Sequence, residues 1–64
     1  MFRDIIDEHR RMAKQQLSDA ADLASGAWRI RDQHGDQSGA IAALKRSLAG
    51  RLLGLANAYE ERDR

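Results

Sequence analysis

The stretch His34-Gly35-Asp36-Gln37-Ser38 separates two long helical patterns and thereby decides the fold. Gly35 suits the left-handed backbone conformation in which many helices end, and Asp36 can cap the helix that follows, with Ser38 as the competing cap. A turn of about residues 35–38 is short enough to force the flanking helices to run antiparallel. The sequence therefore predicts an all-α fold, a single antiparallel helical hairpin over residues 1–64.

Both flanks of this turn repeat their apolar residues with the period of an α-helix. Upstream, apolar side chains fall on one arc from Phe2 to Ile30, which predicts a helix over about residues 2–34, with a possible kink at Gly26. Downstream, a helix is predicted over about residues 37–62. Its apolar stripe consists of Ile41, Leu44, Leu48, Leu52, Leu55 and Tyr59.

Composition limits how such a hairpin can be stabilised. The chain has 64 residues, no cysteine and no proline, and 33% of its residues are charged, with a net charge of +1. Chains this small usually need disulfides, a metal or oligomerisation to fold, and disulfides are excluded here. Neither a secretory signal nor an apolar run of roughly 20 residues is present, so we expect a cytoplasmic protein that does not enter a membrane.

The second helix is apolar around most of its circumference, which predicts self-association. A row of small residues, Ala43, Ser47, Gly50 and Gly54, is expected to face the first helix near Leu17 and Ala20, because two interior glycines favour close backbone approach. The leucine stripe then needs another cover. A second hairpin can supply it, so we expect a homo-oligomer, with a dimeric four-helix bundle favoured.

Two polar residues, His9 and Gln16, interrupt the apolar arc of the first helix. A buried polar layer of this kind can bind a ligand or respond to pH. It can also fix the register of a bundle at some loss of stability, and we favour that structural interpretation.

Cationic residues along one edge of the first helix raise the alternative of nucleic-acid binding. Arg3, Arg10 and Lys14 align there, and Trp28 extends the edge with a ring that can stack on a base. The remaining surface of this helix is acidic, and rows of charge are commonly no more than a solvated face.

No motif for catalysis, cofactors or metals is found. Glu8 and His9 are adjacent, so they point about 100° apart rather than together as metal ligands would. The glycines at 35 and 39 lack the Gly-Lys-Ser/Thr of a phosphate loop. We therefore expect a non-enzymatic protein without cofactor that binds another protein, with RNA or DNA binding as the alternative.

In size, antiparallel layout and alanine-spaced heptads, the chain resembles the Rop family of plasmid copy-number regulators. The resemblance is one of architecture along the whole chain and includes no residue motif, so it assigns no role to any single residue. The resemblance implies a dimeric helical hairpin. For the alternative of nucleic-acid binding, it implies that the ligand is RNA.

Overall fold

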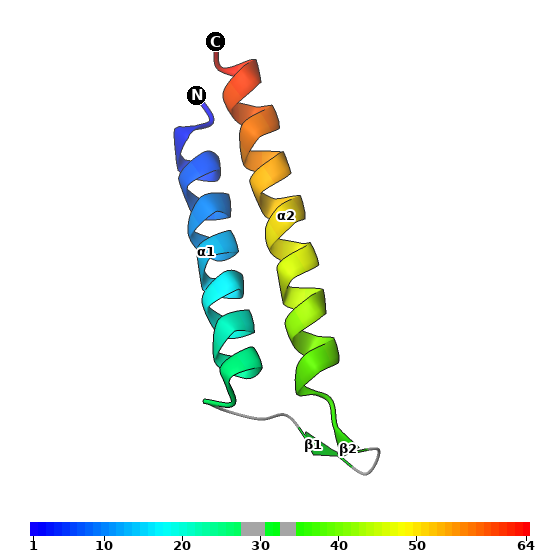
Figure 1. The fold of residues 1–64 in the computed structure, drawn as a ribbon. Coiled ribbons are helices and arrows are strands. Elements are labelled where there is room, and N and C mark those ends of the chain that lie inside the picture. Colours follow the sequence, from blue (N-terminus) through cyan, green and yellow to red (C-terminus); the bar gives the residue numbers. More distant parts are fainter. Residues whose placement is uncertain (28–30, 33–34) are drawn as a thin grey trace.

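In the computed structural model, the chain forms two long helices that lie side by side and run antiparallel (Figure 1). The structure describes residues 1–27, 31–32 and 35–64. Helix α1 spans Arg3–Ser25 and α2 spans Ser38–Arg62, with two short strands between them, β1 at Arg31–Asp32 and β2 at Gly35–Asp36. The all-α helical hairpin predicted from the sequence is thus confirmed.

Helix α1 ends well before the expected bound at residue 34. Gly26 adopts φ 83°, and the N–H of Ala27 donates to the carbonyl of Asp22 at 3.0 Å, while the N–H of Gly26 donates to that of Leu23 at 3.4 Å. This pair of hydrogen bonds is a Schellman motif, which satisfies the last helical carbonyls and turns the chain away. The expected helix over 2–34 was wrong in its last part, because Gly26 ends the helix rather than bending it.

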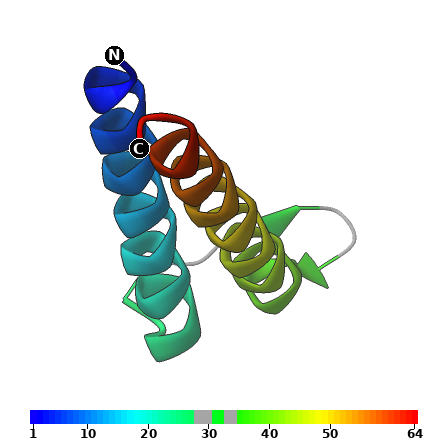
Figure 2. The ribbon, with the colours of Figure 1, turned by 90° about the horizontal axis from the view of Figure 1, so that it is seen from above.

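The connection between the helices is longer than the expected turn over residues 35–38. Strands β1 and β2 pair antiparallel, with Arg31 opposite Asp36 and Asp32 opposite Gly35. Gly35 does adopt a left-handed φ of 103°, but it does so in this strand pair and not at a helix end. The strands lie beside the N-terminal end of α2 (Figure 2).

Helix α2 begins one residue after its expected start and ends at its expected last residue. The carboxylate Oδ1 of Asp36 accepts a hydrogen bond from the backbone N–H of Ser38 at 2.9 Å, so Asp36 satisfies one of the free donors at the helix start. The side chain of Gln37, the residue at the N-cap position, makes no capping hydrogen bond.

Small residues dominate the seam along which the two helices pack. In α1 the buried Ile6, Ala13 and Ala20 recur every seven residues, and in α2 Ala42, Ala49 and Ala56 do the same. Ala13 packs against Ala49 and Leu52, whereas Ala20 and Leu23 pack against Ala42. A seven-residue repeat keeps both seams facing each other, and alanine lets the two backbones approach closely.

The resulting molecule is a narrow rod of 48 × 18 × 14 Å. Each of the two helices buries one side against the other helix and exposes its opposite side to solvent. Neither helix in the described part of the chain is long and apolar enough to cross a membrane.

Candidate interaction surface

Five large apolar side chains remain exposed on one side of the hairpin, and we call this set the leucine face. Its members are Ile5 and Met12 of α1 and Leu44, Leu48 and Leu55 of α2. Leu44 is 65% exposed, Leu48 44% and Leu55 48%. These fractions are high for leucines that follow one another along a single helix side.

Contacts across the seam show that both helices contribute to the same side. The ring of His9 lies 5.9 Å from that of Tyr59, and Gln16 Oε1 accepts a hydrogen bond from Lys45 Nζ at 3.2 Å. Ile5 and Met12 each precede His9 and Gln16 by four residues and are therefore their neighbours on the helix surface. Leu55 precedes Tyr59 in the same way, and Leu48 is likewise four residues after Leu44.

The predicted stripe of α2 is divided between the seam and this open side. Leu52 is 7% exposed and belongs to the seam, and Ile41 and Tyr59 are half-buried beside it. Counted at about 100° per residue, Leu48 and Leu55 lie about a quarter-turn from the alanine seam, and Leu44 lies further round the helix in the same direction. One neighbouring helix covers the first group and leaves the second uncovered.

The glycine row does not pack against α1, and that prediction was wrong. Gly50 and Gly54 are exposed, and a Cβ atom added at either would meet no atom within 4 Å. Ala20 packs with Ala42 instead, and Leu17 is exposed. Ala42, Ala49 and Ala56, each at most 1% exposed, form the seam in place of the glycine row.

Two shallow hollows follow the leucine face along α2. One is lined by Leu44, Ser47, Leu48 and Arg51, and the other by Leu55, Ala58, Tyr59 and Arg62. Both sets have the spacing i, i+3, i+4, i+7. Four residues with this spacing form the hole that receives one side chain of a facing helix in knobs-into-holes packing. The hollows therefore have the form that suits another helix.

His9 and Gln16, predicted to be buried, are half-buried at the edge of the seam and have polar partners. The Nδ1 of His9 lies 2.8 Å from the backbone carbonyl of Ile5, to which a protonated Nδ1 donates. Lys45, which donates to Gln16, also pairs with Asp19 at 3.3 Å. Hydrogen bonds from Gln15 and from Lys45 lower the pKa of Asp19. These contacts tie the two helices together in one register.

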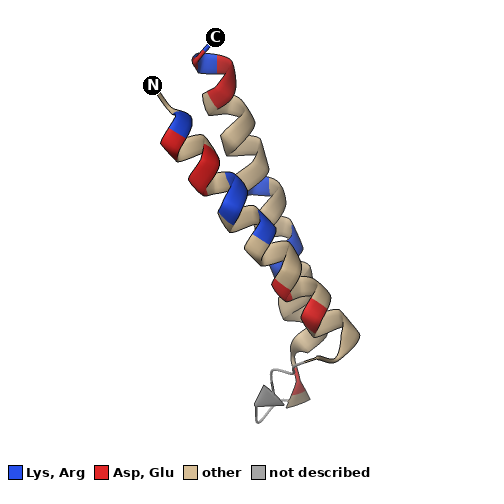
Figure 3. Ribbon diagram, turned by 90° about the vertical axis from the view of Figure 1, so that its left-hand side faces the viewer, with Lys and Arg blue, Asp and Glu red and all other residues tan. Residues whose placement is uncertain are grey.

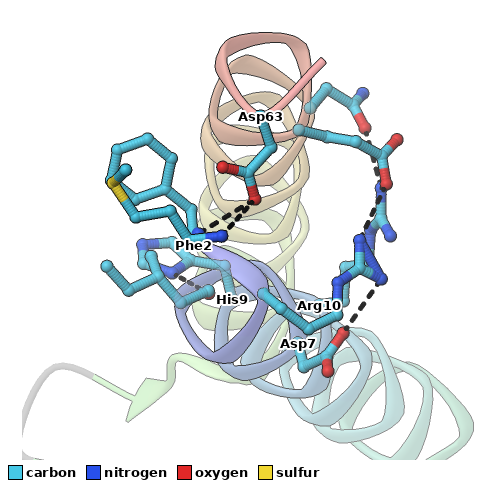
Figure 4. A network of polar contacts seen from close by, with 10 residues as sticks. Phe2, Asp7, His9, Arg10 and Asp63 are labelled. Carbon is cyan, nitrogen blue, oxygen red and sulfur yellow. Dashed lines mark hydrogen bonds and ion pairs between the residues drawn. The ribbon is translucent and has the colours of Figure 1, made fainter.

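A second polar network joins the two chain ends (Figure 4). Asp63 accepts a hydrogen bond from the Phe2 N–H at 2.9 Å and pairs with the terminal ammonium of Met1 at 3.4 Å. The Phe2 hydrogen bond is the main cause of the lowered pKa of Asp63. A carboxylate at this position also complements the positive end of α1. The phenyl ring of Phe2 packs 5.2 Å from that of Tyr59.

The predicted nucleic-acid edge is largely occupied by ion pairs. Glu60 lies 3.3 Å from Arg3 and 3.2 Å from Arg10, and the hydrogen bond from Arg10 is the main cause of the lowered pKa of Glu60. Arg3 also pairs with Asp7 at 3.7 Å. Lys14 has no ion pair among the described residues, and Trp28 lies outside them. Blocks of cations and blocks of anions follow one another along α1 (Figure 3), so the surface of this helix is mixed in charge.

Within the described ranges 1–27, 31–32 and 35–64, no three histidine, aspartate or glutamate side chains gather into a group that could hold a metal ion. Comparisons of the chain with protein-family models, with curated proteins and with solved structures found no match.

Proposed function

We propose that this chain is a small, non-enzymatic interaction protein that acts as a homo-oligomeric helical bundle, most simply a dimer, whose remaining surface binds another protein. The leucine face carries this proposal. Removing exposed leucine side chains from water contributes about 25 cal/mol of favourable free energy for each Å² of apolar surface that becomes buried. Continuous apolar patches on small monomers are uncommon and usually mark an interaction site.

Solution mass, measured by light scattering across a dilution series, tests the oligomer. We expect a mass above 7.2 kDa that falls on dilution. Leu48→Asp should yield the monomer, because it places a charge in the centre of the leucine face. Leu53→Asp is the matched control: Leu53 is also exposed but lies outside the leucine face, so its variant should keep the mass of the parent. A wild-type monomer at every concentration would contradict the proposal.

The protein partner is tested by affinity capture from the native cell, with the wild type and Leu48→Asp as paired baits. Proteins that depend on the assembled bundle should be captured by the wild type alone. Capture of the same proteins by both baits would show that binding does not need the bundle.

Binding of RNA or DNA is the second candidate, and one observation favours it. Lys14 and Arg46 have no ion pair within the described residues, so both remain available to phosphate groups, and a dimer would present each of them twice. Titration with a mixed RNA and duplex DNA pool at two salt concentrations tests this function. Binding should weaken steeply with salt and weaken further in Lys14→Gln. No binding at low salt would remove this candidate.

A further inference from the structure

We infer that the leucine face binds a second copy of this chain with α2 packed antiparallel on α2 of the partner, around a two-fold axis close to Arg51. This inference rests on the proposed homo-oligomer and adds its arrangement: which helix meets which, and in what register. The other arrangement that covers the leucines would place α2 on α1 of the partner.

The two hollows of α2 carry the inference. They begin at Leu44 and at Leu55, are eleven residues apart, and repeat the same spacing. An antiparallel two-fold axis next to Arg51 places Leu55 over the partner's hollow at 44–51. The same axis places Leu44 over the partner's hollow at 55–62. Because a two-fold contact is reciprocal, one axis fills all four hollows of the dimer with leucine side chains.

The exposed area of the chain is consistent with a missing partner. The chain exposes 4,710 Å², whereas a compact monomer of 7.2 kDa is expected to expose about 4,100 Å². The excess of about 600 Å² approaches the roughly 800 Å² that each partner buries in a stable interface of standard size. An interface of standard size would therefore bring the exposed area of this chain close to that of a compact monomer.

The apolar residues favour α2 over α1 as the surface that meets the partner's α2. On α1 the leucine face has only Ile5 and Met12, with the charged Glu8 between them in the sequence. Between Ser38 and Tyr59, α2 has no carboxylate, and three of its four exposed leucines, Leu44, Leu48 and Leu55, follow one another along the leucine face. Burial of leucine contributes more than exposed ion pairs do, so the leucines should pack on one another.

The charges give this arrangement a salt dependence of known sign. Near the axis, Arg51 of each chain approaches Arg51 of the other, and α2 offers no carboxylate there to neutralise them. Salt screens such repulsion, so the dimer should become tighter as ionic strength rises. With α2 on the partner's α1, cations of α2 would instead face carboxylates such as Glu8, and salt would weaken the dimer.

Sedimentation equilibrium at 50 and 500 mM salt tests the arrangement through the dimer dissociation constant. We expect a lower Kd at high salt, at least a tenfold higher Kd in Leu44→Ala and in Leu55→Ala, and an unchanged Kd in the control Leu53→Ala. Arg51→Gln should lower the Kd and abolish its salt dependence. Circular dichroism of each variant reports whether the helices remain.

Oxidation of Arg51→Cys supplies a measurement that does not depend on affinity. Cysteines next to the two-fold axis come close enough to form an interchain disulfide, which needs Cα atoms within about 7 Å. We expect a covalent dimer from Arg51→Cys and none from Leu53→Cys. A dimer that weakens with salt and does not cross-link at position 51 would overturn this arrangement but keep the proposed oligomer. A monomer under all conditions would overturn both.

Discussion

Several positions in the seam between the two helices have room for no side chain larger than alanine. Ala49 is 1% exposed and contacts Ala13 and Leu52. Ala49→Leu should destabilise the hairpin by about 1–3 kcal/mol, because added methylene groups in a packed interface force the helices apart. Urea denaturation followed by circular dichroism measures the loss. The control is Ala43→Leu on the exposed side of α2, which should leave the free energy of unfolding nearly unchanged.

Gly50 is predicted to behave in the opposite way. A Cβ at this position meets nothing within 4 Å, so the glycine serves no close helix contact within the hairpin. Gly50→Ala should raise the free energy of unfolding by about 1 kcal/mol through helix propensity alone. Gly54→Ala is expected to give a similar gain. Lower stability in both variants would mean that another backbone packs on these glycines in the assembled protein.

At the scale of the helices, the length of α1 is set by one residue. Gly26 holds the left-handed conformation of the Schellman motif at φ 83°, which side chains with a Cβ adopt only at a cost. Gly26→Ala should therefore destabilise the hairpin by about 1 kcal/mol, as measured by thermal unfolding. Gly26→Asn should cost less, since asparagine tolerates this conformation better than alanine does. Equal stability of Gly26→Ala and the wild type would contradict this role.

The antiparallel pair of helices could be predicted, because apolar periodicity and the absence of proline favour helix formation through residues that are close together in the sequence. The helix ends could not all be predicted, since Gly26 and Gly35 are both suited to a left-handed position and the sequence alone does not rank them. Both do adopt positive φ, but only Gly26 ends a helix.

The identity of the packed face could not be chosen securely from α2 alone. Two rows of small residues run along that helix, and glycine, which has no Cβ, permits the closer approach of two backbones. Both rows of α2 repeat every seven residues, as Ile6, Ala13 and Ala20 do in α1. The series through Gly50 and Gly54 continue into the polar Asn57 and Glu61, whereas Ala42, Ala49 and Ala56 keep one apolar residue type along the helix. The existence of an open apolar face on α2 could be predicted. The residues that form it could not, because they depend on which row packs in the seam.

At the scale of the whole molecule, three carboxylates, those of Asp19, Glu60 and Asp63, connect the two helices. Each has a lowered pKa. Hydrogen bonds from Gln15 and Lys45 cause this at Asp19, Arg10 causes it at Glu60, and the Phe2 N–H causes it at Asp63. A carboxyl group whose pKa is lower in the folded state stabilises the fold above its unfolded pKa, here 3.8 for Asp and 4.5 for Glu. That contribution is lost as the pH falls through the folded pKa.

The thermal midpoint should therefore be constant above about pH 5 and fall progressively toward pH 2. In the triple variant Asp19→Asn, Glu60→Gln, Asp63→Asn, the midpoint at neutral pH should be lower and its fall in acid shallower. An equally steep fall in that variant would assign acid sensitivity to other carboxylates and not to the contacts that join the helices.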